Sequence, residues 1–223
     1  HMRTVKLGLI GAGGISQAHC RAISQIEGAE IIAASDLVPS NLERMVNTWG
    51  VSEENTFSDY NEMLKMDQIE AVLVCTPTGV HAPPTVAALH AGKHVLCEKP
   101  LGLNFQEAAK MASAAQERNL ITMVPFTYSF MPTNRYLKEL IMDGYLGKPY
   151  HLNMRYYGGG GRKLDYLWRF DSRRGGTGAL GDIGSHFIYI ARWLFGEIIQ
   201  VRAQLDQLVE RPDLDPNGEE YPK

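Results

Sequence analysis

The stretch VKLGLIGAGGIS at residues 5–16 decides the fold of this 223-residue chain. Residues 5–10 are mostly apolar and predict a buried strand, and the glycines after them open a helix expected at residues 15–25. In this G-x-G-x-x-S run, Gly11 allows a tight turn and the small Ser16 lets the helix pack closely on the strand. The stretch therefore predicts a strand, a tight turn and a helix.

The same loop has features of a phosphate-binding turn. Gly13 lets the backbone approach a pyrophosphate, and the amides of Gly14 and Ile15 would face it at the helix N-terminus, where the dipole favours negative charge. Asp36, followed by Leu37, closes the next expected strand, where a carboxylate can accept both ribose hydroxyls and repel a 2′-phosphate. These features favour NAD over NADP. The alternatives are an ordinary glycine-rich turn and a helix N-terminal charge.

Short apolar runs alternate with amphipathic segments as far as residue 124. This rhythm is typical of right-handed βαβ units, so we expect a doubly wound parallel sheet of the Rossmann type. The further strands are expected at residues 31–34, 71–75, 94–97 and 121–124, and the further helices at residues 39–49, 59–65, 82–91 and 105–118.

After residue 124 the pattern changes, which predicts two domains: a dinucleotide-binding domain at 1–124 and an α/β domain at 125–223. In the second we expect a mostly antiparallel open sheet, with helices at 132–143 and 183–195 and strands at 150–157 and 198–209. The chain ends in a loop rich in Pro and acidic residues, so we expect the C-terminal part of this domain to be missing.

Composition excludes several classes of protein. With 44% hydrophobic residues and a formal net charge of −3, the chain predicts a soluble globular protein without the basic footprint of a nucleic-acid or membrane partner. Cys20, Cys75 and Cys97 lie in apolar runs without C-x-x-C spacing, and indicate buried thiols of the reducing cytoplasm. The histidines and cysteines show no metal-ligand spacing, so we expect no metal.

Three further motifs follow the glycine loop in order. They are CTPTGVH at residues 75–81, CEKP at 97–100 and GGTGALGDIGSH at 175–186. In this combination the chain resembles the glucose–fructose oxidoreductase, inositol dehydrogenase and rhizopine-catabolism (Gfo/Idh/MocA) family over essentially its whole length. The resemblance implies a Rossmann domain for a nicotinamide cofactor, an α/β domain over the substrate, association into oligomers, and a cis peptide bond before Pro100.

The expected catalytic residues are Lys99, Asp182 and His186. Oxidising an alcohol requires a base for the hydroxyl proton, and histidine is best tuned for that task near neutral pH. Asp182 and His186 are spaced i, i+4 and share a helix face, while Lys99 would hydrogen-bond the substrate oxygen. Spacing alone favours a structural Asp–His pair, and most lysines are solvated surface residues. Lys99 and the family pattern together reverse this and favour catalysis.

Other residues are expected to surround the cofactor. Thr76 and Glu98 begin loops at the carboxyl edge of the sheet, where open α/β sheets bind ligands. The resemblance implies that Trp168 and Arg169 line the cleft, against the alternative of a core tryptophan and a surface arginine. The full expected set is Gly11, Gly13, Gly14, Ile15, Asp36, Leu37, Thr76, Pro77, His81, Glu98, Trp168 and Arg169.

These observations predict an NAD-dependent dehydrogenase that oxidises a secondary alcohol of a cyclic polyol or sugar. One alternative is a glycosidase of the same family that uses NAD transiently, and another is a non-catalytic dinucleotide sensor. The chain departs from the family at residues 127–132, where Thr127 and Ser129 replace an amide and a guanidinium, so contacts made there are not transferred.

Overall fold

A computed structural model describes residues 3–158, 167–171, 173–206 and 209 of the chain. The chain divides into two compact units, His1–Pro125 and Phe126–Lys223, and each unit is described by itself. The strand expected to run as far as residue 209 and the loop expected at 210–223 extend beyond the described residues.

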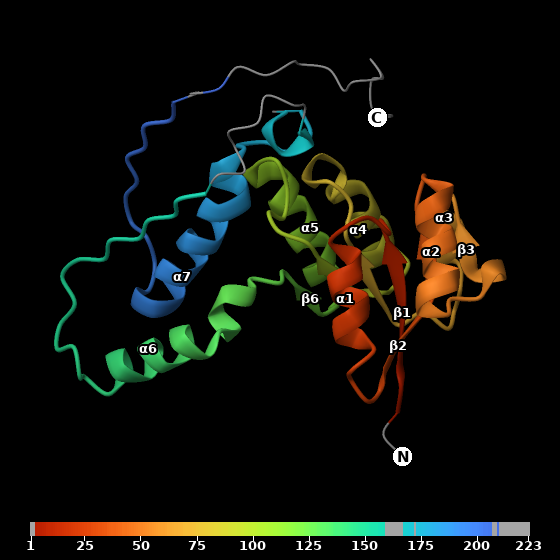
Figure 1. The fold of residues 1–223 in the computed structure, drawn as a ribbon, viewed down its shortest axis with the longest axis horizontal. Coiled ribbons are helices and arrows are strands. Elements are labelled where there is room, and N and C mark those ends of the chain that lie inside the picture. Colours follow the sequence, from red (N-terminus) through yellow and green to blue (C-terminus); the bar gives the residue numbers. More distant parts are fainter. Residues whose placement is uncertain (1–2, 159–166, 172, 207–208, 210–223) are drawn as a thin grey trace. The chain divides into compact units, whose positions relative to one another are not determined.

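The first unit is built on a six-stranded parallel sheet with the order β3-β2-β1-β4-β5-β6 (Figure 1). This is the doubly wound order of the Rossmann fold, and it confirms the expected parallel sheet. The order reverses between β1 and β4, the point where such sheets bind ligands beyond the carboxyl ends of their strands. The strands are β1 (Val5–Ile10), β2 (Ala29–Ser35), β3 (Thr56–Phe57), β4 (Ala71–Val74), β5 (His94–Cys97) and β6 (Thr122–Met123).

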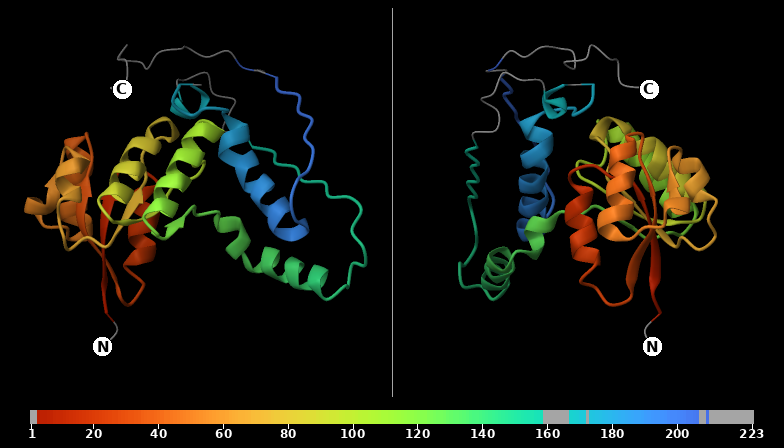
Figure 2. Two further views of the ribbon diagram at one scale, coloured as in Figure 1. Left: turned by 180° about the vertical axis from the view of Figure 1, so that it is seen from behind. Right: turned by 45° about the vertical axis from the view of Figure 1, so that its right-hand side comes forward.

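Helices cover both faces of this sheet (Figures 1 and 2). Consecutive residues of a strand point to opposite faces, so Leu9 and Ile10 of β1 belong to two different cores. The core around Leu9 includes residues of α1 (Ser16–Ile23) and α2 (Pro39–Trp49). The core around Ile10 includes residues of the helices α3 (Tyr60–Leu64), α4 (Ala82–His90) and α5 (Phe105–Glu117).

The burial of the strands explains why their sequences are continuously apolar. Val72, Leu73 and Val74 of β4 are at most 3% exposed, because neighbours cover them on both faces.

Two further features compare with the sequence predictions. Strand β3 was not expected, since a strand of two residues is too short to show a period of two. The three cysteines are buried and free, as predicted.

The second unit contains two long helices, α6 (Pro132–Met142) and α7 (Ser185–Phe195). Lys138 of α6 lies 4.2 Å from the centre of the Trp193 ring of α7 and donates to the Trp193 carbonyl at 3.2 Å. A π-helical turn, Leu180–Gly184, leads directly into α7, where a regular helix from residue 183 was expected.

The strands expected in the second unit are not observed. Among the described residues of that unit, no strand is assigned, and 150–157 and 198–206 have no regular structure. A strand exists only where its N–H and C=O groups exchange hydrogen bonds with a partner strand, which alternation of side chains alone does not provide. The open antiparallel sheet is therefore not confirmed.

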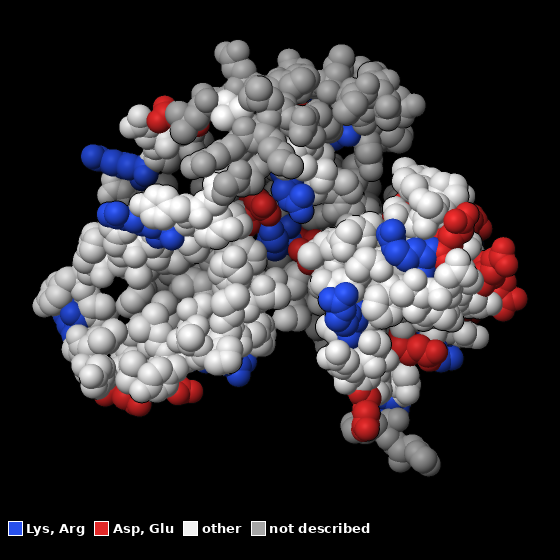
Figure 3. Space-filling model, viewed as in Figure 1, with Lys and Arg blue, Asp and Glu red and all other residues white. Residues whose placement is uncertain are grey.

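Charged side chains of both signs appear on the face drawn in Figure 3, and neither sign covers it. Among the described residues, no helix combines the length and the apolar content that a membrane crossing requires.

Candidate functional site

The glycine loop lies between the end of β1 and the start of α1. Gly11 has φ +86°, and a Cβ atom added there would lie 2.7 Å from the backbone nitrogen of Thr76. The loop thus passes so close to the residue after β4 that only glycine fits. At Gly13 and Gly14, by contrast, an added Cβ would meet nothing within 4 Å, so this side of the loop is open to a ligand.

Asp36, which follows β2, is fixed against this loop. Its Oδ2 accepts the Ala12 amide at 2.7 Å and its Oδ1 accepts the Val38 amide at 2.8 Å. Each carboxylate oxygen has two acceptor sites, so each can still accept one ribose hydroxyl. The exposed Leu37 and Ile15, 65% and 46% exposed, offer apolar surface near this end of the sheet. These residues fit the adenosine half of a dinucleotide.

Arg44 of α2 was not identified from sequence, although it contacts the same loop. Its Nη2 donates to the Ala12 carbonyl and to the Asn41 side chain, both at 2.7 Å. Asp36 therefore accepts from the amide of Ala12, and Arg44 donates to the carbonyl of the same residue. Helix α2 brings Arg44 back to the loop, so no local spacing marks this contact.

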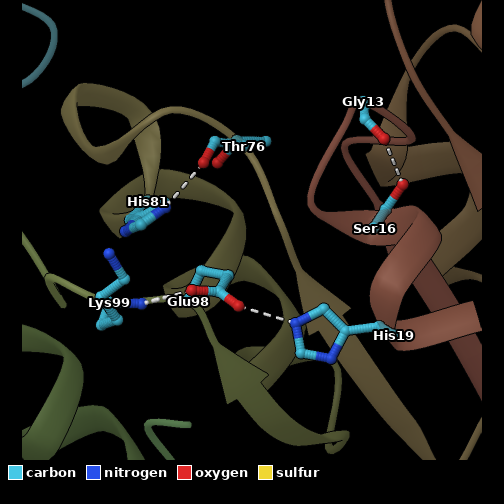
Figure 4. A network of polar contacts seen from close by, with 7 residues as sticks. All are labelled: Gly13, Ser16, His19, Thr76, His81, Glu98 and Lys99. Atoms are coloured by element: carbon cyan, nitrogen blue, oxygen red, sulfur yellow. Dashed lines mark hydrogen bonds and ion pairs between the residues drawn. The ribbon is translucent and has the colours of Figure 1, made fainter. Parts of the chain in front are cut away.

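Glu98 connects two elements at the carboxyl edge of the sheet (Figure 4). Its Oε1 lies 2.7 Å from His19 Nε2 of α1, and its Oε2 accepts the Lys99 amide at 3.0 Å. Burial acts to raise the pKa of Glu98, but the hydrogen bonds and positive charges of His19 and Lys99 outweigh it and lower the pKa overall. The carboxylate is therefore ionised at neutral pH. His19 was missed from sequence, although its place one turn after the glycine loop could have pointed to it.

His81 is placed differently from our expectation. The residue is 1% exposed, and one ring nitrogen lies 2.9 Å from the Pro100 carbonyl. The other lies 2.7 Å from the Thr76 carbonyl (Figure 4). Burial lowers the pKa of His81, although the backbone carbonyls of Thr76 and Pro100 act to raise it. The neutral ring has one N–H and therefore donates to only one of the two carbonyls. Both nitrogens face backbone, so the side chain offers no polar atom to a cofactor and instead joins the loops after β4 and β5.

The loop after β5 carries Lys99, whose side chain is half-buried. The Lys99–Pro100 peptide is cis, as the resemblance implied. The thiols of Cys97, which ends β5 immediately before Glu98, and of Cys20 in α1 are poor nucleophiles, because burial raises the pKa of Cys97 to about 12 and that of Cys20 to about 11. Among the described residues, no group of three His, Cys, Asp or Glu side chains could hold a metal ion.

In the second unit, His186 lies in the first turn of α7 and is 6% exposed. Its ring stacks on Tyr128, with the centroids 4.2 Å apart and the planes at 14°, and meets the edge of Phe126 at 5.7 Å. Phe126 in turn stacks on Tyr189 at 4.5 Å. These aromatic contacts restrict the imidazole to one orientation.

Asp182 lies in the π-helical turn immediately before α7. Its Oδ2 is 3.6 Å from Nε of Arg169, and the Arg169 guanidinium lies 4.7 Å from the centre of the Trp168 ring. The structure thus brings together Asp182, Arg169 and Trp168. π-Helical turns are rare and frequently occur at functional sites.

The first unit defines a class of protein: the open glycine loop, the acid after β2 and the order of the strands are those of α/β proteins that bind dinucleotides. Residues 5–126 match the family described as an oxidoreductase family with an NAD-binding Rossmann fold. Residues 134–219 match the Gfo/Idh/MocA C-terminal domain. The chain belongs to the Gfo/Idh/MocA family, which confirms the resemblance and the expected NAD-binding Rossmann unit.

Several relatives are similar to the chain. It is 33% identical to the glucose-6-phosphate 3-dehydrogenase of Bacillus subtilis over 192 residues, which are 85% of this chain and 53% of the relative. It is 32% identical to the levoglucosan dehydrogenase of Pseudarthrobacter phenanthrenivorans over an alignment 224 positions long, gaps included. This alignment covers 95% of this chain and 56% of the relative. A solved levoglucosan dehydrogenase in complex with NADH superposes with a TM-score of 0.79 at 30% identity, covering 87% of this chain and 55% of that one. The chain spans about half the length of the curated relatives it matches.

Proposed function

We propose that the protein is an NAD-dependent dehydrogenase that oxidises a secondary alcohol of a sugar or cyclic polyol. The observation that carries this proposal is Asp36, held at the open glycine loop with an acceptor site left on each oxygen. The names of the relatives, which include dehydrogenases of glucose 6-phosphate, levoglucosan and myo-inositol, support the substrate class.

NAD, when bound, accepts the hydride. The protein must then remove the hydroxyl proton, and we assign that task to His186, whose orientation is fixed by Tyr128 and Phe126. Lys99 donates a hydrogen bond to the substrate oxygen and lowers the pKa of the hydroxyl. Asp182, beside Arg169, orients substrate or base. These roles rest on the order of the motifs in the family.

We assign the cofactor to the first unit, with contributions from Trp168 and Arg169 of the second. Asp36 favours NAD over NADP, because a 2′-phosphate would meet its negative charge. His81 contributes by shaping the loops rather than by touching the cofactor. The cofactor residues of this proposal are Gly11, Gly13, Gly14, Ile15, Asp36, Leu37, Thr76, Pro77, Glu98, Trp168 and Arg169.

We further propose that residues 150–157 and 198–205 pair as strands of the open sheet once partner strands are present. Both segments expose large apolar side chains, among them Tyr150, Tyr157, Ile199 and Val201. Burying this surface against further strands, and against a second copy of the protein, would stabilise the unit. The free thiols suit the cytoplasm.

The test is a cofactor-reduction screen of the protein that carries this sequence against a panel of sugars and polyols, with NAD and NADP compared. We expect NADH to accumulate with at least one alcohol. A glycosidase that uses NAD transiently would consume a glycoside without net NADH. Binding of NAD without turnover of any alcohol or glycoside would contradict the proposal and indicate a sensor.

Two variants test the assigned roles. His186→Gln and Lys99→Met should each lower kcat by about 100-fold or more, because a positioned acid or base contributes about 10²–10⁴-fold. The affinity for NAD should change little. His151→Gln, at an exposed histidine of the second unit, is the control and should retain activity. A His186→Gln enzyme with nearly full kcat would overturn its role as base.

A further inference from the structure

The function proposed above assigns Glu98 to the cofactor but gives no role to His19, which contacts it. The two residues are 79 positions apart in sequence, yet Nε2 of His19 lies 2.7 Å from Oε1 of Glu98. Their side chains are 18% and 10% exposed, so water screens this pair only weakly. A shielded, short contact of this kind fixes the geometry of both partners.

Glu98 passes this constraint on to the next residue. While Oε1 faces His19, Oε2 accepts the backbone N–H of Lys99 at 3.0 Å (Figure 4). The carboxylate is thus held at both oxygens, and the chain direction at Lys99 is held with it.

Helix α1 supplies the other end of the connection. It starts at Ser16, whose hydroxyl donates to the Gly13 carbonyl at 2.7 Å and so ties the helix to the glycine loop (Figure 4). His19 lies one turn further along the same helix. The path from Gly13 through Ser16, His19 and Glu98 to Lys99 therefore consists of contacts within one unit.

We propose that His19 is a positioning residue that sets Lys99 relative to the glycine loop by holding the Glu98 carboxylate. The proposal deepens the function given above and rests on it, since it takes Lys99 to contact the substrate oxygen. Glu98 is also within the electrostatic influence of His81 and of the thiols of Cys75 and Cys97.

Removing the His19 imidazole would leave Oε1 of the buried Glu98 carboxylate without its N–H donor. A buried carboxylate in that situation either takes up a proton or turns toward water. Both responses weaken the contact with the Lys99 amide. A displacement of about 1 Å at a reacting group can cost about 100-fold in rate.

The experiment compares His19→Leu with His19→Gln in the protein that carries this sequence. Glutamine places an N–H donor close to the position of Nε2, whereas leucine fills similar space without one. The control is His90→Leu, the same substitution at an exposed histidine at the end of α4. Thermal melts exclude variants that fail to fold, and His19→Ala, which also lacks the donor, replaces His19→Leu if that variant is one of them.

Three measurements decide the outcome. In His19→Leu we expect kcat to fall by about tenfold or more and hydrogen exchange of the peptide that contains residues 98–101 to become faster. Because Glu98 is also assigned to the cofactor site, the dissociation constant of NAD should rise, but by a smaller factor than kcat falls. His19→Gln should recover most of kcat and most of the protection from exchange. His90→Leu should equal the parent protein in all three measurements.

Other outcomes overturn the proposal. Unchanged exchange and unchanged kcat in His19→Leu would show that the pair positions nothing. An equal loss in kcat and in NAD affinity would assign His19 to cofactor binding instead. Failure of the parent protein to oxidise any alcohol would refute the proposed function, and with it any role of the His19–Glu98 pair in catalysis. Faster exchange in His19→Leu would then show only that the contact holds the backbone at residues 98–101.

Discussion

Asp36 accepts two backbone N–H groups, from Ala12 and Val38, before any ligand arrives. These bonds orient the carboxylate at the end of β2 and leave one acceptor site on each oxygen. The side chain therefore acts in two ways, by holding the glycine loop and by presenting acceptors at its open side. Replacing Asp36 should therefore affect both the position of the glycine loop and the binding of the cofactor.

We expect Asp36→Ser to weaken NAD binding by about tenfold or more, since hydrogen bonds to a charged group contribute about 1.5–3 kcal/mol each. Binding of NADP should weaken less or improve, because the repulsion of the 2′-phosphate is lost. Fluorescence titration with each cofactor measures the ratio of the two dissociation constants. Asp67→Ser, at an exposed aspartate of the same unit, is the control. An unchanged preference for NAD would contradict the role given to Asp36.

At the scale of elements, the turn between β1 and α1 places two glycines under different demands. An added Cβ at Gly11 would lie 2.7 Å from the Thr76 nitrogen, in a backbone conformation with φ +86°. At Gly13 an added Cβ meets open space. Gly11 is thus required by the fold itself. Gly13 is required only if a ligand approaches the loop.

The two alanine variants should therefore differ in kind. Gly11→Ala should lower the melting temperature markedly, because both the backbone conformation and the contact with the end of β4 resist a side chain. Gly13→Ala should melt close to the parent protein but bind NAD less tightly. Thermal melts with and without NAD separate the effects. Equal melting temperatures for the two variants would contradict this assignment.

At the scale of the whole molecule, two buried groups of the first unit respond to acid in the same direction. Burial lowers the pKa of His81 below its ordinary value of 6.5. For Glu98, the hydrogen bonds and charges of His19 and Lys99 outweigh burial and lower the pKa below 4.5. In each case the unfolded chain binds a proton that the folded chain excludes. Stability is thus fully present above the ordinary value of each group and falls as the pH drops below it.

We expect the melting temperature to decrease from about pH 6.5 downward as His81 begins to contribute, and again below about pH 4.5 through Glu98. One proton contributes at most about 1.4 kcal/mol per pH unit. His81→Gln should reduce the slope between pH 7 and pH 5, whereas the exposed His90→Gln should not. Parallel slopes for His81→Gln and the parent protein would contradict the buried neutral state of His81.

Much of the first unit is determined by the sequence alone. The strands from β1 to β6, apart from β3, and the helices between them show in the apolar runs and the helical periods, because these patterns depend on residues close in the chain. The glycine loop and Asp36 were found for the same reason. Gly11 requires a left-handed turn, and the acid stands at a fixed distance from it.

Tertiary structure alone decided the contacts that join separate strands. His19 meets Glu98, and Arg44 reaches Ala12, because parallel strands and their helices end at one edge of the sheet, whatever the distance along the chain. The burial of His81 between two carbonyls follows from that convergence. The strands expected in the second unit are not confirmed, for the converse reason: alternation marks a face, but a strand requires a partner to accept its hydrogen bonds.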